Sequence, residues 1–489
     1  MAGYPVALSQ GELIAKILAD PSWRNFAVDS RNVVPGSLFF ALPGERSDGH
    51  RYIPQAIEAG ARAVILYKSY FTSHEQTLLE AAGIGEHTDE SPVVPELAPG
   101  QEPAVFVPVE DSLACLQAAG AAVLAVSRAL RLGITGSNGK TGTKDMLVSV
   151  MSRAGLVHSR SGNFNSVIGL PIVMAATPAD AEYAVLEMAM SEVGEMDTLA
   201  ELVKPNAAIL TNIGTAHIGN IGSIEGIARE KFAIFSRMGP EGLAVIPGTD
   251  EQAMKRLQNH PLECRVVFYG CSEDFGFEHL SAGSGGTRFR YGGSEYFIPV
   301  IGDHHVHNAC GVITLAREMG LSPQRIAEGL ASFTLPEGRG ELLQLGDITV
   351  INDSYNANPD SMAAALAAAG ELGSSEGRLW LVLGDMKELG GHAAAGHRET
   401  LLRAIDSRPD RIICYGADFA AAAGKIDIPP SAETETPLVT ASEDFEEIAG
   451  ILESELAPGD RVLLKGSRSM ELERLIPVIH RAGKSGDGV

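Results

Sequence analysis

Apolar and polar positions along the chain form a pattern that predicts strands alternating with helices. Continuous apolar runs at residues 130–134, 184–187 and 207–211 are typical of central strands that are buried on both faces of a parallel sheet. Apolar residues at helical spacing predict a helix over 143–153, directly after the first of these strands. We therefore predict a mostly parallel α/β domain between about residues 109 and 335.

The same alternation returns after this region, and a smaller α/β region precedes it. The later strands are predicted at residues 348–351, 379–383, 411–415 and 461–464, which indicates a Rossmann-like α/β domain over 336–489. Before residue 108 the pattern predicts a helix at 9–18, two short strands around Pro35-Gly36, a helix at 54–60 and a strand at 61–67. We interpret the polar, acidic segment 69–102 as an insertion with little core, and residues 287–300 as a peripheral hairpin. The fold class is thus α/β with three domains, at 1–108, 109–335 and 336–489.

Composition narrows the class of protein. The 489 residues suffice for three domains with cores, and 45% apolar with 20% charged residues is typical of a soluble globular protein. The net charge of −24 disfavours nucleic acid or an anionic membrane as a partner. The five cysteines are scattered without a CxxC pair, which predicts reduced thiols and no zinc site. With no signal peptide at the start and no apolar run long enough for a membrane span, we predict a cytoplasmic protein.

A glycine-rich segment, TGSNGKTGTK at 135–144, lies between the first predicted central strand and its helix. A strand, a glycine-rich turn and a helix that opens on Gly-Lys-Thr form a cradle for phosphate groups. Backbone N–H groups face the anion, a lysine reaches the terminal phosphates and a threonine hydroxyl binds Mg²⁺. We predict that the chain binds ATP through Gly136, Ser137, Asn138, Gly139, Lys140 and Thr141.

Polar residues follow the other strands of the predicted central sheet. Glu187 ends one strand and His217 lies just past another. Because ligands of such sheets bind beyond the carboxyl ends of the strands, we expect both side chains near the phosphate loop. A carboxylate and an imidazole there fit Mg²⁺ held between the protein and a triphosphate.

The segment NDSYNANPDSM at 352–362 leads from a predicted strand into an alanine-rich helix. Asn358 fits a helix cap with Pro359 at the first helical position, which is a sufficient structural explanation for both. Capping does not explain Asp353, Tyr355 and Asn356. At the end of the last predicted strand, the basic turn of residues 465–468 is suited to an anion such as a substrate carboxylate.

These motifs together resemble the Mur ligases of peptidoglycan synthesis. The resemblance rests on TGSNGKT, on the Glu187-Met188 strand end, on NIGTAH at 212–217 and on NDSYNANPDSM, and it extends from DSRNVVPGSLFFALPGERSDGH to LLKGSRSM. NDSYNANPDSM with VLGDMKELG is most similar to the members that add D-alanyl-D-alanine. The resemblance implies an amino-terminal uridine-nucleotide domain, a central ATPase domain and a carboxyl-terminal domain that receives the dipeptide. It implies that ATP phosphorylates the carboxylate of a UDP-N-acetylmuramoyl tripeptide and that the dipeptide amine attacks the acyl phosphate.

The resemblance also implies roles for individual residues. Lys140 would hold the transferring phosphate, Thr141, Glu187 and His217 would bind Mg²⁺, and Lys231 matches a lysine that some relatives carbamylate to hold a second Mg²⁺. Asn308 would contact adenine, Arg339 the phosphates and Asp353 the ribose. The substrate residues would be Ser30 and Arg31 for the uridine nucleotide, Asn163 and Asn165 in a substrate loop, and Asn356, Asn358, Lys465 and Arg468 for the dipeptide and peptide stem.

Several positions depart from the family's pattern. Gly142 replaces a threonine, His305 and Ser166 each replace an asparagine, and Met190-Ser191 alters a strand-end motif. We expect an active enzyme with altered nucleotide contacts, in a protein that is a monomer. Two alternatives stay open: a related ligase that adds another amino acid, and a nucleotide-binding switch supported only by Gly142 and His305.

Overall fold

The computed structural model describes residues 8–44, 47–82, 104–270, 276–283, 285–372, 377–426 and 437–484. The chain divides into two compact units. The first comprises residues 1–131, 156–188 and 198–204, and the second comprises residues 132–155, 189–197 and 205–489. None of the described helices is both long and apolar enough to cross a membrane.

The first unit contains a parallel sheet in the order β1-β2-β3-β4. Its strands are β1 (Phe26–Ala27), β2 (Leu38–Phe40), β3 (Ala63–Tyr67) and β4 (Val105–Val109). Alternate residues of β3 enter two different apolar clusters, Ala63 and Ile65 in one and Val64 and Leu66 in the other. Both faces of this sheet are therefore covered, which accounts for its continuous apolar strands.

Helices supply the cover of this sheet. They are α1 (Gln10–Ala19), α2 (Ile53–Glu58), α3 (Lys68–Ala81) and α4 (Ser112–Val126). The predicted first helix is confirmed, and it begins at a capping box in which Ser9 and Glu12 exchange hydrogen bonds.

The prediction of an insertion over 69–102 is wrong at its start. Residues 68–81 form α3, and Leu78 and Ala82 are buried in the cluster on one face of the sheet. Phe71 also packs partly buried against the same cluster, on the other side of the kink at His74, where the backbone is not helical. The polar composition of the segment gave no sign of these buried positions. Residues 83–102 lie outside the described part of the chain.

The first unit also holds β6 (Val157–His158) and β7 (Tyr183–Glu187), which pair in parallel, and α6 (Gly169–Ala175). Helix α6 packs on α4 at close range. A Cβ added to Gly120 of α4 would lie 2.5 Å from the carbonyl oxygen of Pro171, so this contact requires glycine. Helix α7 (Glu195–Val203) is divided between the two units.

The second unit holds the strand that leads into the phosphate loop. Strands β5 (Leu130–Thr135), β8 (Ala207–Leu210), β9 (Leu243–Pro247) and β10 (Arg265–Tyr269) pair in parallel in the order β10-β9-β8-β5. The associated helices are α5 (Lys140–Met151), α8 (Ile218–Ile221), α9 (Ile224–Phe232), α10 (Glu251–Asn259), α11 (Asp303–Glu318) and α12 (Pro323–Ala331). The predicted hairpin is confirmed as β12 (Gly286–Tyr291) and β13 (Ser294–Ile298), with β11 (Glu278–Gly283) as a third antiparallel strand.

The rest of the second unit contains a second sheet, in the order β14-β15-β19-β16-β17-β18. These strands are β14 (Glu341–Leu345), β15 (Ile348–Asp353), β16 (Leu379–Gly384), β17 (Arg411–Tyr415), β18 (Leu438–Ser442) and β19 (Arg461–Lys465). All pairs are parallel except that of β14 with β15. All four strands predicted here are confirmed.

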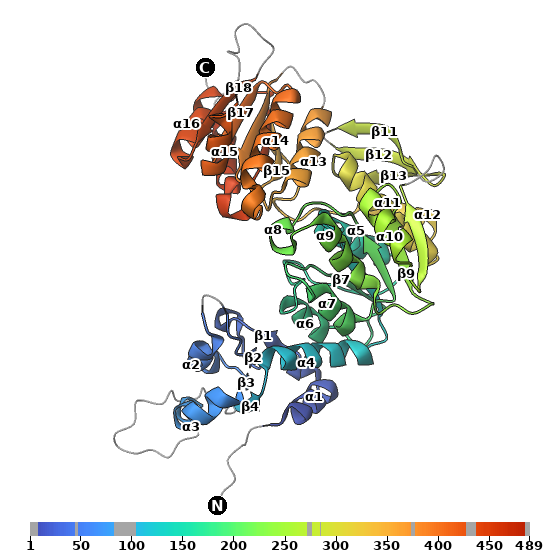
Figure 1. Ribbon diagram of the computed structural model, residues 1–489, viewed down its shortest axis with the longest axis vertical. Helices are drawn as coiled ribbons and strands as arrows, with labels where there is room; N and C mark the ends of the chain where they lie inside the picture. Colours follow the sequence, from blue (N-terminus) through green and yellow to red (C-terminus); the bar gives the residue numbers. More distant parts are fainter. Residues whose placement is uncertain are drawn as a thin grey trace, which may run out of the picture. The chain divides into compact units, whose positions relative to one another are not determined.

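Helices cover both faces of this sheet (Figure 1). They are α13 (Pro359–Glu371), α14 (Ala393–Asp406), α15 (Ala417–Ala423), α16 (Phe445–Glu455) and α17 (Ile476–Lys484). Within β16, Leu381 and Leu383 pack with α13, α14 and α15, whereas Trp380 and Val382 pack with α16 and α17. Short 3₁₀ turns lie at Pro21–Trp23, Ser30–Asn32, Gly49–Tyr52, Ala233–Phe235, Gly390–His392, Arg468–Met470 and Leu472–Leu475.

Candidate active site

The loop between β5 and α5 has the geometry of a phosphate cradle. Gly139 precedes the helix with a left-handed φ of 78°, and a Cβ there would lie 2.4 Å from Asn308 Nδ2. A Cβ at Gly136 would lie 1.8 Å from Thr211 Oγ1. Both positions therefore require glycine, because any side chain would occupy the space of a neighbour. The first turn of α5 presents N–H groups that have no acceptor within the helix.

Residues that follow β8 hold this loop in place. The backbone N–H groups of Ser137 and Asn138 donate to Asn212, to its carbonyl oxygen at 3.0 Å and its Oδ1 at 3.0 Å. Thr211 Oγ1 donates to the Asn138 carbonyl oxygen at 2.6 Å. The loop is therefore preorganised by β8, and the start of α5 is the part left to face an anion.

Two lysines meet on one carbonyl oxygen of the loop. Lys140 Nζ donates to the carbonyl oxygens of Gly136 at 2.8 Å and Ser137 at 3.0 Å. Lys231, on α9, is buried, and its Nζ donates to the same Gly136 oxygen at 2.8 Å. Desolvation, with the charge of Lys140 as a second cause, holds the pKa of Lys231 well below its usual value. The Lys140 ammonium group beside a helix N-terminus makes this a site for a polyanion.

The charges of these lysines affect the pKa of His217. Burial, followed by the charges of Lys140 and Lys231, lowers the pKa of His217 to about 4. The imidazole is therefore neutral at physiological pH and retains a lone pair that a cation can use. His217 also has a left-handed φ of 65°, rare for a residue with a side chain and typical of functional sites. Its prediction as a metal ligand is consistent with this chemistry.

Glu187 and the predicted substrate loop lie together in the first unit. Glu187 is buried at the end of β7, and its Oε1 accepts a hydrogen bond from Asn165 Nδ2 at 2.7 Å. The same amide donates to Asn163 Oδ1 at 3.0 Å. One side chain thus links the predicted substrate loop to the predicted metal-binding carboxylate.

The predicted uridine-nucleotide residues lie between β1 and β2. Ser30 is buried, and its Oγ donates to Gln55 Oε1 at 2.8 Å. Arg31 is exposed and pairs with Asp29 at 2.6 Å. Ser30 is therefore used in packing the loop, whereas Arg31 keeps its guanidinium at the surface.

Two predicted ligand residues, Asp353 and Lys465, pair with each other. They are register partners at the ends of β15 and β19, and Lys465 Nζ lies 2.7 Å from Asp353 Oδ2. Lys465 also donates to the Asn356 carbonyl oxygen at 2.9 Å. Their separate roles toward ribose and dipeptide stay predictions, because in this structure each neutralises the other.

Three more predicted residues, Arg339, Asn358 and Arg468, also have partners in the second unit. The Arg339 guanidinium lies 3.8 Å from the ring centroid of Tyr355, a cation–π arrangement. Asn358 caps α13 as predicted, and its Nδ2 also donates to Asn138 Oδ1 in the phosphate loop at 2.7 Å. Arg468 pairs with Glu473. Asn358 therefore has a second role that the capping explanation does not include.

Comparisons with known proteins cover almost the whole chain. Family models match residues 24–118 (Mur ligase family, catalytic domain), 134–316 (Mur ligase middle domain) and 338–468 (Mur ligase, glutamate ligase domain). The UDP-N-acetylmuramoyl-tripeptide–D-alanyl-D-alanine ligase of Bacillus subtilis is 34% identical, covering 95% of this chain and 96% of its own. The ligase of that name from Treponema pallidum is also 34% identical, over 97% and 98%. The chain belongs to the Mur ligase family.

Solved structures agree with this membership. A crystal structure of MurF from Acinetobacter baumannii has a TM-score of 0.79 at 25% identity, covering 97% of this chain and 99% of its own. MurF ligase from Thermotoga maritima in complex with ADP has the same fold, with a TM-score of 0.75 at 24% identity over 96% of this chain and 99% of its own. The predicted α/β, multidomain Mur ligase architecture is confirmed.

Two departures from the Mur ligase pattern have different surroundings. A Cβ at Gly142 would meet Leu335 Cδ2 at 3.6 Å, an ordinary contact, so no lack of space at the Cβ explains the missing threonine. His305 is buried at the start of α11, and its Nδ1 has no hydrogen-bond partner among the described residues. Its ring lies against Gly340, where a Cβ would come 3.1 Å from Nε2. His305 thus packs beside the residue that follows Arg339.

We expect His305→Asn to make the protein less sensitive to acid. Burial, with the neighbouring His304 and Lys465 as further causes, holds the pKa of His305 well below its usual value. The unfolded chain therefore binds a proton that the folded protein does not, and stability is lost as pH falls below about 6.5. Removing this group should therefore make the loss of stability between pH 7 and pH 5 smaller. Thermal unfolding midpoints at both pH values measure this effect.

The exposed His260 provides the control for this experiment. His260→Asn should leave the difference between the two midpoints unchanged. An unchanged difference in His305→Asn as well would contradict the assignment of His305 as a buried neutral imidazole.

Sequence reasoning missed Thr211 and Asp360. Thr211 fills the space beside Gly136, and Asp360 Oδ2 accepts hydrogen bonds from Thr215 N at 2.7 Å and Thr215 Oγ1 at 2.9 Å. A carboxylate in the first turn of a helix is usually explained by the helix dipole, so Asp360 gave no separate signal. Thr211 is the last residue of the predicted strand at 207–211, and only the structure shows that it approaches Gly136.

Asp385, His397 and Asp418 form the one cluster in the described chain with the spacing of metal ligands. Their atoms already have partners. Asp385 accepts hydrogen bonds from Lys387 Nζ at 2.8 Å and Phe419 N at 2.9 Å, and His397 Nε2 accepts one from Met386 N at 2.9 Å. Because the imidazole lone pair is used, this cluster orders the loop after β16 and does not bind a metal.

Proposed function

We propose that this Mur ligase joins D-alanyl-D-alanine to UDP-N-acetylmuramoyl tripeptide, using ATP and forming an acyl phosphate on the way. Relatives of that name match 95–97% of the chain at 34% identity, which supports the substrates. The observation that carries the chemistry is the meeting of Lys140 and Lys231 on the Gly136 carbonyl oxygen, beside the N-terminus of α5. This product would be the UDP-linked pentapeptide precursor of peptidoglycan.

The proposed reaction needs charge neutralisation and alignment more than covalent help from the protein. Lys140 and the N–H groups that open α5 would hold the transferring phosphoryl group as the tripeptide carboxylate attacks the γ-phosphorus and ADP leaves. The dipeptide amine, in its unprotonated form, then attacks the acyl carbon. The C–N bond forms, the C–O bond to phosphate breaks, and phosphate and a proton are released. We propose that Asn308 and Arg339 bind the nucleotide, and that Asn356 lies near the dipeptide.

Mg²⁺ is part of this proposal. The donors suited to it are the buried Thr141 hydroxyl, the Glu187 carboxylate, the neutral His217 and a carbamate on Lys231. Bound Mg²⁺ would neutralise charge on the phosphoryl oxygens. The low pKa of Lys231 fits the carbamate, because only an unprotonated amine reacts with CO₂.

The domain assignment belongs to the same proposal. We propose a uridine-nucleotide domain at 1–108, an ATP-binding domain at 109–335 and a dipeptide-binding domain at 336–489. The three family models match segments with similar limits, which supports this division. We further propose that the protein works as a cytoplasmic monomer.

Phosphate release from ATP tests this function directly. With UDP-N-acetylmuramoyl tripeptide present, release should require D-alanyl-D-alanine, and the product should be heavier by the dipeptide less one water. Release that requires a different amino acid would identify a sister ligase. ATP binding without release for any amine would contradict the ligase and leave a nucleotide-dependent switch.

A further inference from the structure

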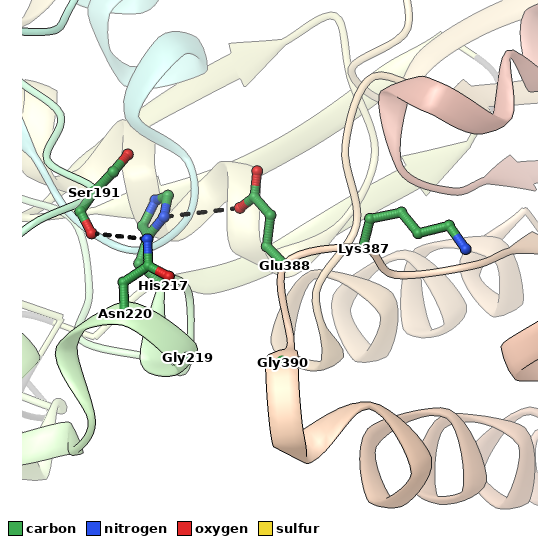
Figure 2. A pocket seen from close by; sticks show the side chains of 7 residues that line it. All are labelled: Ser191, His217, Gly219, Asn220, Lys387, Glu388 and Gly390. Atoms are coloured by element: carbon green, nitrogen blue, oxygen red, sulfur yellow. Dashed lines mark hydrogen bonds and ion pairs between the residues drawn. The ribbon is translucent and has the colours of Figure 1, made fainter. Parts of the chain in front are cut away.

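A cavity of about 380 Å³ in the second unit brings together the loop after β8 and the loop after β16 (Figure 2). It is lined by Ser191, His217, Gly219, Asn220, Lys387, Glu388 and Gly390. Glu388 is the one carboxylate among these lining residues, and Figure 2 shows it directed toward His217. Lys387 and Glu388 belong to the VLGDMKELG segment.

The carboxylate of Glu388 is available to a ligand. Its Oε2 lies 3.7 Å from His217 Nδ1, too far for a hydrogen bond, and its side chain is 55% exposed. Among the residues that the structure describes, no side chain or backbone group donates a hydrogen bond to it. Glu388 therefore presents an anionic acceptor to the cavity.

The polar neighbours of Glu388 have other partners. Lys387 extends away from the cavity centre in Figure 2, and its Nζ lies 2.8 Å from Asp385 Oδ2 and 3.5 Å from Asp418 Oδ2. The Asn220 amide donates to the Ser191 carbonyl oxygen at 3.3 Å and to Glu192 Oε1 at 3.0 Å. Neither residue neutralises Glu388, so a cation from outside the chain would complete this site.

We propose that Glu388 binds the ammonium group of the incoming D-alanyl-D-alanine. This inference rests on the proposed function, which requires an amine beside the phosphoryl site. The cavity satisfies that requirement, because Glu388 faces His217, and His217 lies on the loop that follows β8 next to the phosphate loop. A carboxylate forms charge-assisted hydrogen bonds with an ammonium group, and these are stronger than neutral ones.

Glu388→Gln removes the charge and keeps the size and shape of the side chain. We expect the KM for D-alanyl-D-alanine to rise about tenfold or more, the usual consequence of losing one charge-assisted hydrogen bond. The KM values for ATP and for the UDP-linked tripeptide should stay within about twofold, and Glu388→Asp should recover part of the loss. Glu399→Gln is the matched control, because Glu399 is an exposed carboxylate of α14 paired with Arg403 at 2.8 Å. It should leave all three KM values unchanged.

Hydroxylamine separates this inference from the proposed function. It is a small amine, uncharged at neutral pH, that converts an acyl phosphate to a hydroxamate and phosphate without needing an ammonium site. With ATP and the UDP-linked tripeptide, wild type and Glu388→Gln should form hydroxamate at equal rates. No hydroxamate in wild type would contradict the proposed function itself. Equal hydroxamate with an unchanged dipeptide KM would overturn the role of Glu388 alone.

Two further outcomes also overturn it. A parallel loss of hydroxamate formation and dipeptide ligation would place Glu388 in phosphoryl transfer or in folding, which thermal unfolding then separates. An increased Mg²⁺ requirement with an unchanged dipeptide KM would identify Glu388 as a metal ligand.

Discussion

Lys140→Ala is expected to reduce dipeptide-dependent phosphate release by at least about 10³-fold. Lys140 Nζ lies over the phosphate loop, where it donates to the carbonyl oxygens of Gly136 and Ser137. A triphosphate in the loop would draw this ammonium group from the carbonyls to the phosphoryl oxygens, where negative charge must be neutralised during transfer. The loss should appear in kcat, because the interaction strengthens as the phosphoryl group moves.

The variant needs a control for folding and one for charge. Lys255→Ala removes an exposed lysine that pairs with Glu225 at 3.4 Å, and it should keep wild-type activity. Lys140→Arg keeps the charge with a different shape and should stay strongly impaired. Lys140→Ala that unfolds at the wild-type temperature yet retains more than a tenth of the activity would contradict the role given to this lysine.

The parts of the site that the sequence predicts well are set by neighbouring residues in the chain. The phosphate loop follows from glycines at 136 and 139 between an apolar strand and an amphipathic helix, and both glycines occupy positions that exclude a side chain. The cap of α13 follows in the same way from Asn358 and Pro359. Local conformation decides these features, so a pattern of adjacent residues is sufficient evidence for them.

Contacts between distant segments could not be predicted in the same way. The pairing of Asp353 with Lys465 depends on the register of β15 against β19, more than a hundred residues apart. The hydrogen bond from Asn358 to Asn138 depends on how two loops meet. The sequence suggested a ligand for each of these side chains. The structure shows that they also form an ion pair and a hydrogen bond with one another.

The error at α3 has a similar cause. Its exposed face is polar enough to resemble a linker, and among its described side chains only Leu78 is buried, with Ala82 buried just beyond its end. Burial against the neighbouring sheet, which composition does not report, stabilises this helix.

Lys231 is the other residue at which a substitution should strongly reduce activity. Its amine is buried beside Lys140, and the low pKa that results makes it reactive toward CO₂. Carbamylation would give this amine a negative charge that attracts both Lys140 and Mg²⁺. We therefore expect Lys231→Ala to lose at least about 10²-fold in activity, since it removes this charge from the phosphoryl site.

Bicarbonate dependence distinguishes the carbamate from a plain lysine. Wild-type protein prepared without CO₂ should lose activity and recover it when bicarbonate is added, and recovery should weaken as pH falls because protonation removes the reactive amine. Lys231→Arg retains a cation that forms no stable carbamate, so it should be as impaired as Lys231→Ala and should not respond to bicarbonate. Equal activity of wild type with and without CO₂, together with an active Lys231→Arg, would show that Lys231 acts only through its positive charge. The surroundings of Gly136 favour the first result, because burial and the charge of Lys140 keep the Lys231 amine unprotonated and therefore reactive toward CO₂.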